Sequence, residues 1–366
     1  MPMIEIVKKG LKSHPLLDGA SSLGTTISSE VSELSKYVTN KTLSLLDRAE
    51  SYEDIINIEV GDTALSRARN FERETGLRQI YVKFEGSNPT GTQKDRIAFA
   101  QCHDALRREY DTITCATCGN YGASIALAAQ LAGLRCVIYI PESYHTKRIH
   151  EMVNAGAGVE RFAGSYEDAV LFSCEQAQKN EWYDCNPGGA NTMLQITAYA
   201  QIAYEIYDSL RDAPKICAVP VSNGTLLAGV YRGFVNLYKR GKTSRVPRMV
   251  AASSFKKNPI VYSFKKGFDT CGDLERTKIS ESKINEPLIN WHSFDGDEAL
   301  WAINQSQGSA YDTSDEKMAR YSKQLKDKEG LHVLPASTVG LVALLEMHRK
   351  SALEPDRYVA VLTGRK

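Results

Sequence analysis

The sequence predicts an α/β protein built from two open, mostly parallel sheets with helices on both faces. Short apolar runs alternate with amphipathic stretches from about residue 79 to the end of the chain, and this alternation is typical of right-handed β–α–β units. One run, RCVIYIP at 135–141, is apolar almost throughout, as expected for a strand buried on both faces of a parallel sheet. The units are too many for one sheet, so we expect two.

The expected elements follow in chain order. A strand at 79–84 leads to a helix at 96–110, and a small-residue helix at 123–133 ends at a glycine, a common helix terminator. A helix at 165–180 begins with Ser165, a good cap, and has acids in its first turn. The other expected strands lie at 112–116, 135–141, 159–162, 215–221, 248–253 and 358–364, and the other helices at 38–50, 146–158, 196–210, 226–240 and 337–350. Residues 265–300 are polar and irregular, and are interpreted as connections.

The composition is that of a globular protein without an obvious polyanionic partner. The 366 residues are 42% hydrophobic and 24% charged, and the formal net charge is +1. We therefore expect no nucleic-acid partner and no attraction to an acidic membrane surface. No apolar run approaches the roughly 18 residues that span a bilayer, and the first residues lack the order of a signal peptide. A cytoplasmic protein is the expectation.

The eight cysteines are scattered, and two of them form a lone C-x-x-C, Cys115 and Cys118. A structural zinc site needs a second pair of ligands, and the sequence offers none at suitable spacing. We therefore predict two reduced thiols and no metal.

Three unusual loops come after expected strands, where open α/β sheets bind their ligands. The first, EGSNPTGTQKDR at 85–96, has the glycine spacing of a P-loop, but Lys94 comes two positions too late for that motif. Lys94 lies just inside an expected helix, where positive potential lowers the pKa of an amine. A neutral lysine is a nucleophile toward carbonyls, whereas the alternative is a solvated loop lysine. Asp95 and Arg96 are interpreted as a structural charge pair.

The other two loops are rich in small polar residues. ATCGNYGAS at 116–124 places Asn120, an amide donor, between residues that allow close approach of a flat ligand. VSNGTLLAG at 221–229 exposes backbone N–H groups at a helix start, a plausible phosphate site. Taken alone, each loop is better explained as a helix cap. Together with Lys94 they meet the needs of pyridoxal phosphate, which has an aldehyde, a phosphate and a ring hydroxyl.

On these motifs the sequence resembles the fold-type II pyridoxal-phosphate enzymes, the superfamily of tryptophan synthase β and cysteine synthase, and in particular their threonine synthase-like branch. EGSNPTGTQKDR is similar to the lysine loop of that family, CATCGNYGAS to its asparagine loop and VPVSNGTLLAG to its phosphate loop. GDTAL, GSYEDAV, TSDEK, LPAS and VAVLTG also fall in family order, so the resemblance covers roughly residues 58–366.

The resemblance implies a role for each matching residue. Lys94 would be both the catalytic residue and the Schiff-base lysine, Asn120 would contact the ring oxygen of the cofactor, and Thr363 would face the pyridine nitrogen. The expected phosphate ligands are Ser222, Asn223, Gly224, Thr225 and Leu226. The expected substrate contacts are Thr117, Cys118, Gly119 and Tyr121. Cys118 replaces a usual Ser or Thr, Tyr121 replaces a small residue, and Gln93 stands where threonine synthases usually carry an aromatic residue.

The resemblance also implies a reaction. Lys94 would remove the α-proton of an amino acid, followed by β- or γ-elimination or replacement, with O-phosphohomoserine to threonine as the default lyase reaction. The alternatives are β-replacement on serine, O-acetylserine or O-phosphoserine, as in cysteine or cysteate synthases, and an amino-acid dehydratase. A regulatory protein that binds pyridoxal phosphate and a P-loop kinase are the readings from other classes.

The resemblance further implies two domains with the active site in the cleft between them. We expect residues 1–96 and 205–366 to form a large cofactor-binding domain. Residues 97–204 would form a smaller, mobile domain that carries the asparagine loop. Relatives are commonly dimers, so a homodimer is expected.

Overall fold

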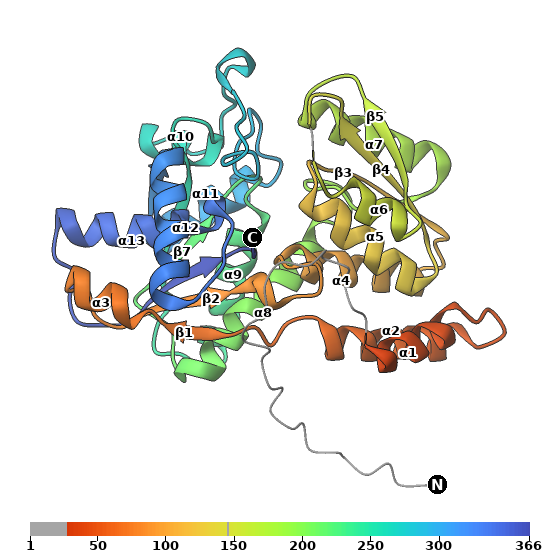
Figure 1. Ribbon diagram of the computed structural model, residues 1–366, viewed down its shortest axis with the longest axis horizontal. Helices are drawn as coiled ribbons and strands as arrows, with labels where there is room; N and C mark the ends of the chain where they lie inside the picture. The colour runs from red at the N-terminus through yellow and green to blue at the C-terminus, as the bar shows by residue number, and fades with distance from the viewer. Residues whose placement is uncertain (1–27, 145) are drawn as a thin grey trace, which may run out of the picture.

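The computed structural model describes residues 28–144 and 146–366, which form two sheets in separate lobes (Figure 1). The larger sheet has the order β1-β2-β10-β7-β8-β9 and the smaller sheet the order β5-β4-β3-β6. The pair β1 and β2 is antiparallel, and the other strand pairs of these described residues are parallel. The predicted fold class, with two mostly parallel sheets, is confirmed.

The strands are short and the helices connect them across the sheets. The strands are β1 (Leu65–Arg67), β2 (Ile80–Phe84), β3 (Thr112–Ala116), β4 (Arg135–Pro141), β5 (Gly158–Phe162), β6 (Tyr183–Asp184), β7 (Ile216–Pro220), β8 (Arg248–Ser254), β9 (Ser309–Thr313) and β10 (Tyr358–Leu362). The helices are α1 (Ser29–Thr39), α2 (Leu45–Glu59), α3 (Arg69–Thr75), α4 (Lys94–Arg107), α5 (Asn120–Ala132), α6 (Ile149–Asn154), α7 (Tyr166–Asn180), α8 (Thr192–Leu210), α9 (Thr225–Lys239), α10 (Pro259–Lys266), α11 (Gly296–Gln305), α12 (Asp315–Glu329) and α13 (Val339–Lys350), with 3₁₀ turns at Glu85–Ser87, Arg276–Lys278 and Pro335–Thr338.

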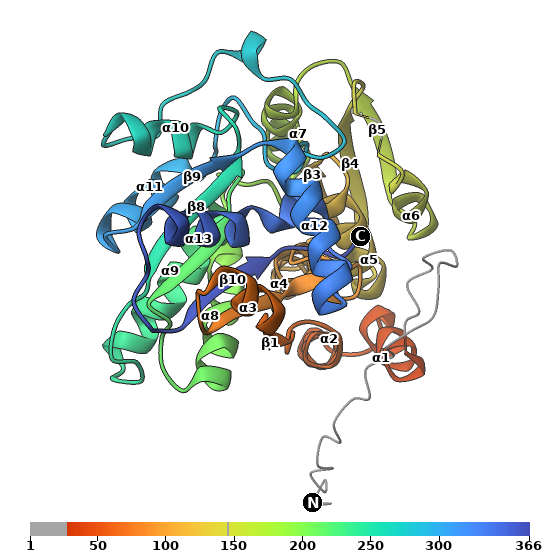
Figure 2. The same ribbon diagram turned by 60° about the vertical axis from the view of Figure 1, so that its left-hand side comes forward.

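Helices cover both faces of the larger sheet. Helices α12 and α13 lie on one side (Figure 2), where α13 packs on β7, β8 and β10. Helices α9 and α11 pack on the sheet from the other side, and α8 packs against α9. Every residue of β7 and β10 is buried, including Cys217 and Val359 on one face and Ile216 and Tyr358 on the other. This burial on both faces explains the continuous apolar runs of the sequence.

The last strand of the chain lies in the middle of the larger sheet. β10 pairs in parallel with β2 on one side and with β7 on the other, with Leu362 opposite Phe84. The segment that follows β10 therefore comes out beside the segment that follows β2. As a result, the carboxyl end of the chain and the lysine loop at 85–96 meet at one edge of the sheet.

Some expected elements differ from those observed. The helix expected at 38–50 is wrong, because two helices, α1 and α2, flank a turn at 40–44. Strand β9 and helix α12 were not expected. The portion of the proposed large domain at residues 1–27 lies outside the described residues. Within the described chain, no helix is both long and apolar enough to cross a bilayer.

Candidate active site

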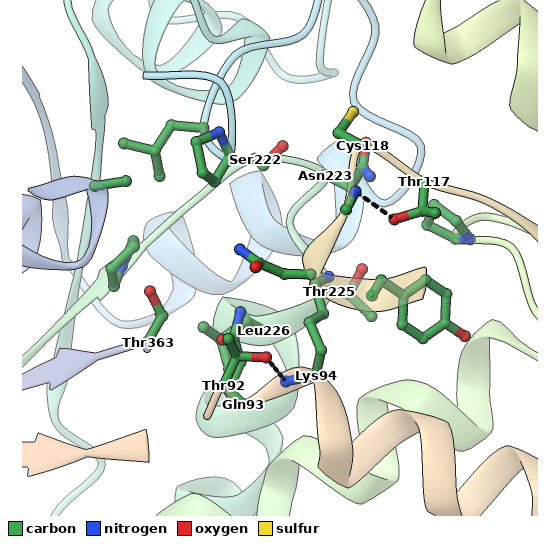
Figure 3. A pocket seen from close by; sticks show the side chains of 18 of the residues that line it. Thr92, Gln93, Lys94, Thr117, Cys118, Ser222, Asn223, Thr225, Leu226 and Thr363 are labelled. Carbon is green, nitrogen blue, oxygen red and sulfur yellow. Dashed lines mark hydrogen bonds between the residues drawn. The ribbon is translucent and has the colours of Figure 1, made fainter. Parts of the chain in front are cut away.

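The three loops singled out in the sequence meet at one cavity, together with the segment after β10. The cavity encloses about 1110 Å³ of space between atoms, part of it open to solvent. Its lining includes every predicted site residue, namely Lys94, Thr117, Cys118, Gly119, Asn120, Tyr121, Ser222, Asn223, Gly224, Thr225, Leu226 and Thr363. Figure 3 shows most of these side chains around a common space.

Lys94 is the first residue of α4, and its loop is fixed by the chain that follows β10. The N–H of Gln93 donates to the carbonyl of Thr363 at 3.0 Å, and Thr92 forms a β-bridge with Gly364. The Lys94 N–H donates to Thr92 Oγ1 at 3.2 Å (Figure 3). These contacts hold the lysine at the N-terminus of α4 rather than on a mobile loop.

The surroundings of the Lys94 amine favour its neutral form. Burial lowers the pKa of Lys94 to about 8, and the carboxylate of Asp295 opposes this shift. The amine lies 5.5 Å from the centre of the Tyr121 ring. A lysine with this pKa is partly neutral near neutral pH, as a nucleophile or a base requires.

The asparagine loop turns sharply before α5. Gly119 has φ of 150°, and a Cβ there would lie 2.5 Å from Thr146 Oγ1, so glycine is required. The Thr117 hydroxyl accepts from the N–H groups of Gly119 (3.1 Å) and Gly122 (3.2 Å). This turn sets Asn120 at the start of the helix, on the cavity wall.

Asn120 and Tyr121 present different groups to the cavity. Arg148 donates to Asn120 Oδ1 at 3.1 Å, which leaves the amide N–H₂ of Asn120 as the free donor among the described residues. Tyr121 contributes its ring to the cavity, while its hydroxyl bonds with Gln101 and with the Cys185 carbonyl (2.8 Å). The hydroxyl of Tyr121 is thus held in the core.

The loop between β7 and α9 forms a ring of unpaired donors. Within the described chain, the backbone N–H groups of Ser222–Leu226 have no hydrogen-bond acceptor. Three features fix the loop: Gly224 has φ of 103°, the Asn223 carbonyl accepts from the Asp295 N–H at 3.0 Å, and Thr225 donates its hydroxyl to the Asp295 carboxylate. Orphan N–H groups at the start of a long helix form an anion site.

Thr363 lies at the end of β10 with a partner that the sequence did not single out. Its Oγ1 is 3.0 Å from the hydroxyl of Ser337. Ser337 Oγ also accepts from the N–H of Gly364 at 3.0 Å. Ser337 lines the cavity and is fully buried. The LPAS motif carried it, but nothing in the motif alone indicated its direction.

Asp95 and Arg96 do not form the charge pair expected from the sequence. The Asp95 carboxylate accepts from the N–H (2.9 Å) and hydroxyl (2.7 Å) of Thr90. The Arg96 guanidinium pairs with Glu85 at 2.6 Å and with Glu205 at 2.7 Å. Both neighbours of the lysine thus anchor its loop and helix, but through separate partners, because consecutive helical residues point in different directions.

Residues 56–364 match the family model described as "Pyridoxal-phosphate dependent enzyme". The chain belongs to this family. This membership confirms the resemblance and the cofactor predicted from the sequence. Within the family the chain is threonine synthase-like: threonine synthase of Methanocaldococcus jannaschii is 29% identical over 313 residues, which are 85% of this chain and 76% of the relative. Threonine synthase of Methanosarcina acetivorans is 27% identical over 315 residues, which are 84% and 75% of the two chains.

Solved structures of other family members have the same fold. Maize serine racemase superposes with a TM-score of 0.72 at 18% sequence identity, covering 87% of this chain and 92% of the other. Identity this low reports the architecture of the family and not the reaction of this chain.

The donors around the cavity fit the cofactor of the family. Pyridoxal phosphate presents an aldehyde, a phosphate and a ring oxygen. The cavity offers an amine of lowered pKa at Lys94 and a free amide donor at Asn120. It also offers the unpaired N–H groups of Ser222–Leu226 and the paired hydroxyls of Thr363 and Ser337. These residues would hold pyridoxal phosphate in this family member.

One wall of the cavity comes from a segment that the sequence left unassigned. Residues 267–295 join α10 to α11, and Glu286–Ile289 line the cavity. Burial and the neighbouring Glu281 raise the pKa of Glu286 to about 7. Tyr166, at the start of α7, closes the same region, and its hydroxyl accepts from the Asn223 amide at 3.1 Å. Glu286–Ile289 carry no motif, whereas Tyr166 belongs to GSYEDAV, and tertiary packing brings both to the site.

Proposed function

We propose that this chain uses pyridoxal phosphate to eliminate or replace a group on the β- or γ-carbon of an amino acid. The observation that carries the proposal is the meeting of Lys94 with the unpaired N–H groups of Ser222–Leu226 in one cavity. Both the amine and the anion site are needed to hold the cofactor. Neither is explained by the packing of the fold alone.

The residues of the cavity support proton transfer at the α-carbon. Held by these residues, pyridoxal phosphate would supply an electron sink for the Cα of an amino acid. The Lys94 Nζ accepts the Cα proton, which its pKa of about 8 allows near neutral pH. The hydroxyls of Thr363 and Ser337 carry no charge to hold a ring nitrogen protonated. That neutrality favours elimination or replacement over transamination.

The threonine synthase relatives make O-phosphohomoserine the reference substrate, with threonine as product and the enzyme a lyase. Cys118 and Tyr121 line the cavity next to Asn120, and we propose that Thr117, Cys118, Gly119 and Tyr121 contact the substrate. β-Replacement on a serine-like substrate, by a transferase, uses the same proton transfer and is the second candidate. It is kept because Cys118 stands where the family usually has Ser or Thr, so the substrate pocket departs from the usual one.

The test begins with the visible absorption of the purified protein. Borohydride treatment and proteolysis should give one peptide with a reduced pyridoxyl group on Lys94, and Lys94→Ala should lose the band. Lys283→Ala, at an exposed lysine of the cavity segment, is the matched control and should keep it. A band that survives in Lys94→Ala would refute the assignment. A band that no amino acid perturbs would favour a regulatory protein.

Three properties of the assembly are proposed with the function. We infer that residues 97–204 move as a unit relative to residues 28–96 and 205–366. We also infer that the protein is a cytoplasmic homodimer, by analogy with its relatives. Sedimentation equilibrium of the cofactor-loaded protein measures the mass directly, and a single species of 40.5 kDa would rule out the dimer.

A further inference from the structure

The cavity has an unusual balance of charge. Among the described residues that line it, only two side chains carry a formal charge, Lys94 and Glu286. The remainder are apolar, hydroxyl, thiol or amide groups, apart from backbone. The cavity therefore offers a single cationic group, which is the one expected to engage the aldehyde of the cofactor.

This balance is a poor match for a phosphorylated substrate. The N–H groups of Ser222–Leu226 can bind one phosphate, and the cofactor brings that phosphate with it. A phosphate on the substrate would be a second dianion, and such groups are usually bound by Arg or Lys. In this cavity it would meet the carboxylate of Glu286 without a cationic side chain to compensate.

Glu286 is held in place by its neighbours on the segment. Its N–H donates to the Ser282 carbonyl at 3.1 Å. Asn285 Oδ1 accepts from the Ser282 N–H at 2.8 Å, and the Ser282 hydroxyl donates to Asp315 at 2.5 Å. Leu288, two residues later, is buried in the core. The backbone that carries the carboxylate is therefore tied to the body of the larger lobe on both sides.

The carboxylate of Glu286 has no partner of its own. In residues 28–144 and 146–366 it makes no hydrogen bond and no ion pair, although the residue is only partly exposed. The carboxylate of Glu281 lies close enough to repel that of Glu286. The thiol of Cys118 is also near Glu286, and its pKa is raised first by burial and then by Glu286. A partly buried carboxylate without a partner loses hydration, which costs free energy. A cation bound beside it would remove that cost.

We propose that Glu286 forms, next to Cys118, a subsite for a protonated primary amine. This inference rests on the proposed function, because it takes the cavity as the active site. The amine would be carried either by the side chain of the substrate, as in a diamino acid, or by a separate amine that replaces the leaving group. In both cases the α-amino and α-carboxylate groups remain free for the cofactor and the asparagine loop.

The test compares three amino acids of similar length and different side-chain charge. L-2,4-diaminobutyrate, L-homoserine and O-phospho-L-homoserine are titrated into the cofactor-loaded protein, and the shift of the visible band gives each Kd. The wild type should bind diaminobutyrate roughly 10- to 100-fold more tightly than homoserine, the range for a hydrogen-bonded charge pair. If a separate amine is the ligand, methylamine should instead bind with this preference when homoserine is already present.

Variants assign the preference to one carboxylate. Glu286→Gln keeps the size and should bring the preference for diaminobutyrate over homoserine to within about twofold. Glu286→Asp should retain part of the preference. Glu275→Gln, at an exposed acid of the same segment that pairs with Lys278, is the control and should behave as wild type. Thermal melting confirms that each variant is folded.

The outcomes separate the two proposals. If the band responds to homoserine but neither diaminobutyrate nor methylamine is preferred, the amine subsite is wrong and the proposed function stands. The same follows if O-phosphohomoserine binds the wild type at least as tightly as diaminobutyrate. If the protein shows no band and no label on Lys94, both proposals are overturned.

Discussion

The neutral fraction of Lys94 can be measured without the cofactor. Burial lowers its pKa to about 8, against an opposing effect of Asp295. At pH 7 roughly one Lys94 amine in eleven is then neutral, compared with roughly one in three thousand for a lysine of ordinary pKa near 10.5. The structure thus predicts roughly 300-fold more reactive amine at pH 7 than an exposed lysine would supply.

Competitive acetylation of the apoprotein measures the pKa of Lys94 individually. Trace acetic anhydride labels only neutral amines, and mass spectrometry of the digest gives the rate for each lysine from pH 6 to 11. The Lys94 peptide should reach half of its maximal rate at pH about 8. Exposed Lys41 supplies an internal reference in the same digest. Slow access to the cavity lowers the maximal rate of Lys94 but leaves its midpoint in place.

A variant checks the cause of the shift. Asp295→Asn removes the carboxylate that opposes the shift, so the midpoint of Lys94 should move to lower pH. The asparagine can still bond with the Thr225 hydroxyl. A wild-type midpoint near 10.5 would refute the claim that burial of Lys94 prepares it for reaction. A midpoint that rises in Asp295→Asn would refute the assigned charge balance.

Three further changes test the scaffold of the site. Gly224→Ala puts a Cβ 2.5 Å from a backbone oxygen at φ of 103°. The affinity for pyridoxal phosphate, measured by fluorescence quenching, should therefore fall at least about tenfold. Gly241→Ala, also at positive φ but with open space around it, should leave this affinity unchanged. Glu205→Gln removes one carboxylate partner of Arg96 and should lower the free energy of unfolding in urea by about 3–5 kcal/mol at pH 7. Although burial opposes the shift, the ion pair lowers the pKa of Glu205 to about 2. The stability that this pair contributes is therefore complete above a pH of about 4.5 and is lost as the pH falls toward 2. The difference in unfolding free energy between wild type and Glu205→Gln should close over that range. Tyr121→Phe leaves buried Gln101 and the Cys185 carbonyl without their hydrogen-bond partner. It should lower the free energy of unfolding by about 1–3 kcal/mol without loss of the visible band.

The sequence was most informative where a local pattern determines the structure. The buried strands are continuous apolar runs, and the three loops are marked by glycine and asparagine next to them. Lys94, Asn120 and Gly224 each begin or precede a helix in the structure, which follows from these short-range signals. The two parallel sheets then bring loops that lie about 130 residues apart, such as those of Lys94 and Gly224, to one cavity.

Other elements depended on contacts that no local pattern reveals. Strand β9 reads SAYDT, which is too polar and short to be recognised, and it becomes a strand by pairing with β8 at the edge of the sheet. Helix α1 buries only Val31 and Val38 among its residues, so its periodicity is weak. Its cap, Ser28, was an available signal. The partner choice of Arg96 is likewise tertiary, because Glu205 lies on a distant helix.

The same distinction separates the cofactor from the substrate. The groups that would hold pyridoxal phosphate lie on loops fixed by their own strands and helices, so the sequence indicates them directly. The wall that carries Glu286 belongs to a segment without regular structure, and long-range contacts place that segment. The backbone N–H of Trp291 donates to the Glu167 carboxylate at 2.9 Å, and Arg276 pairs with Asp168 at 3.0 Å. Because Glu167 and Asp168 begin α7 in the smaller lobe, the side of the cavity that we assign to the substrate changes whenever the two lobes shift. If the lobes move as we propose, substrate choice would depend on how they meet, through contacts of GSYEDAV that the motif alone does not reveal.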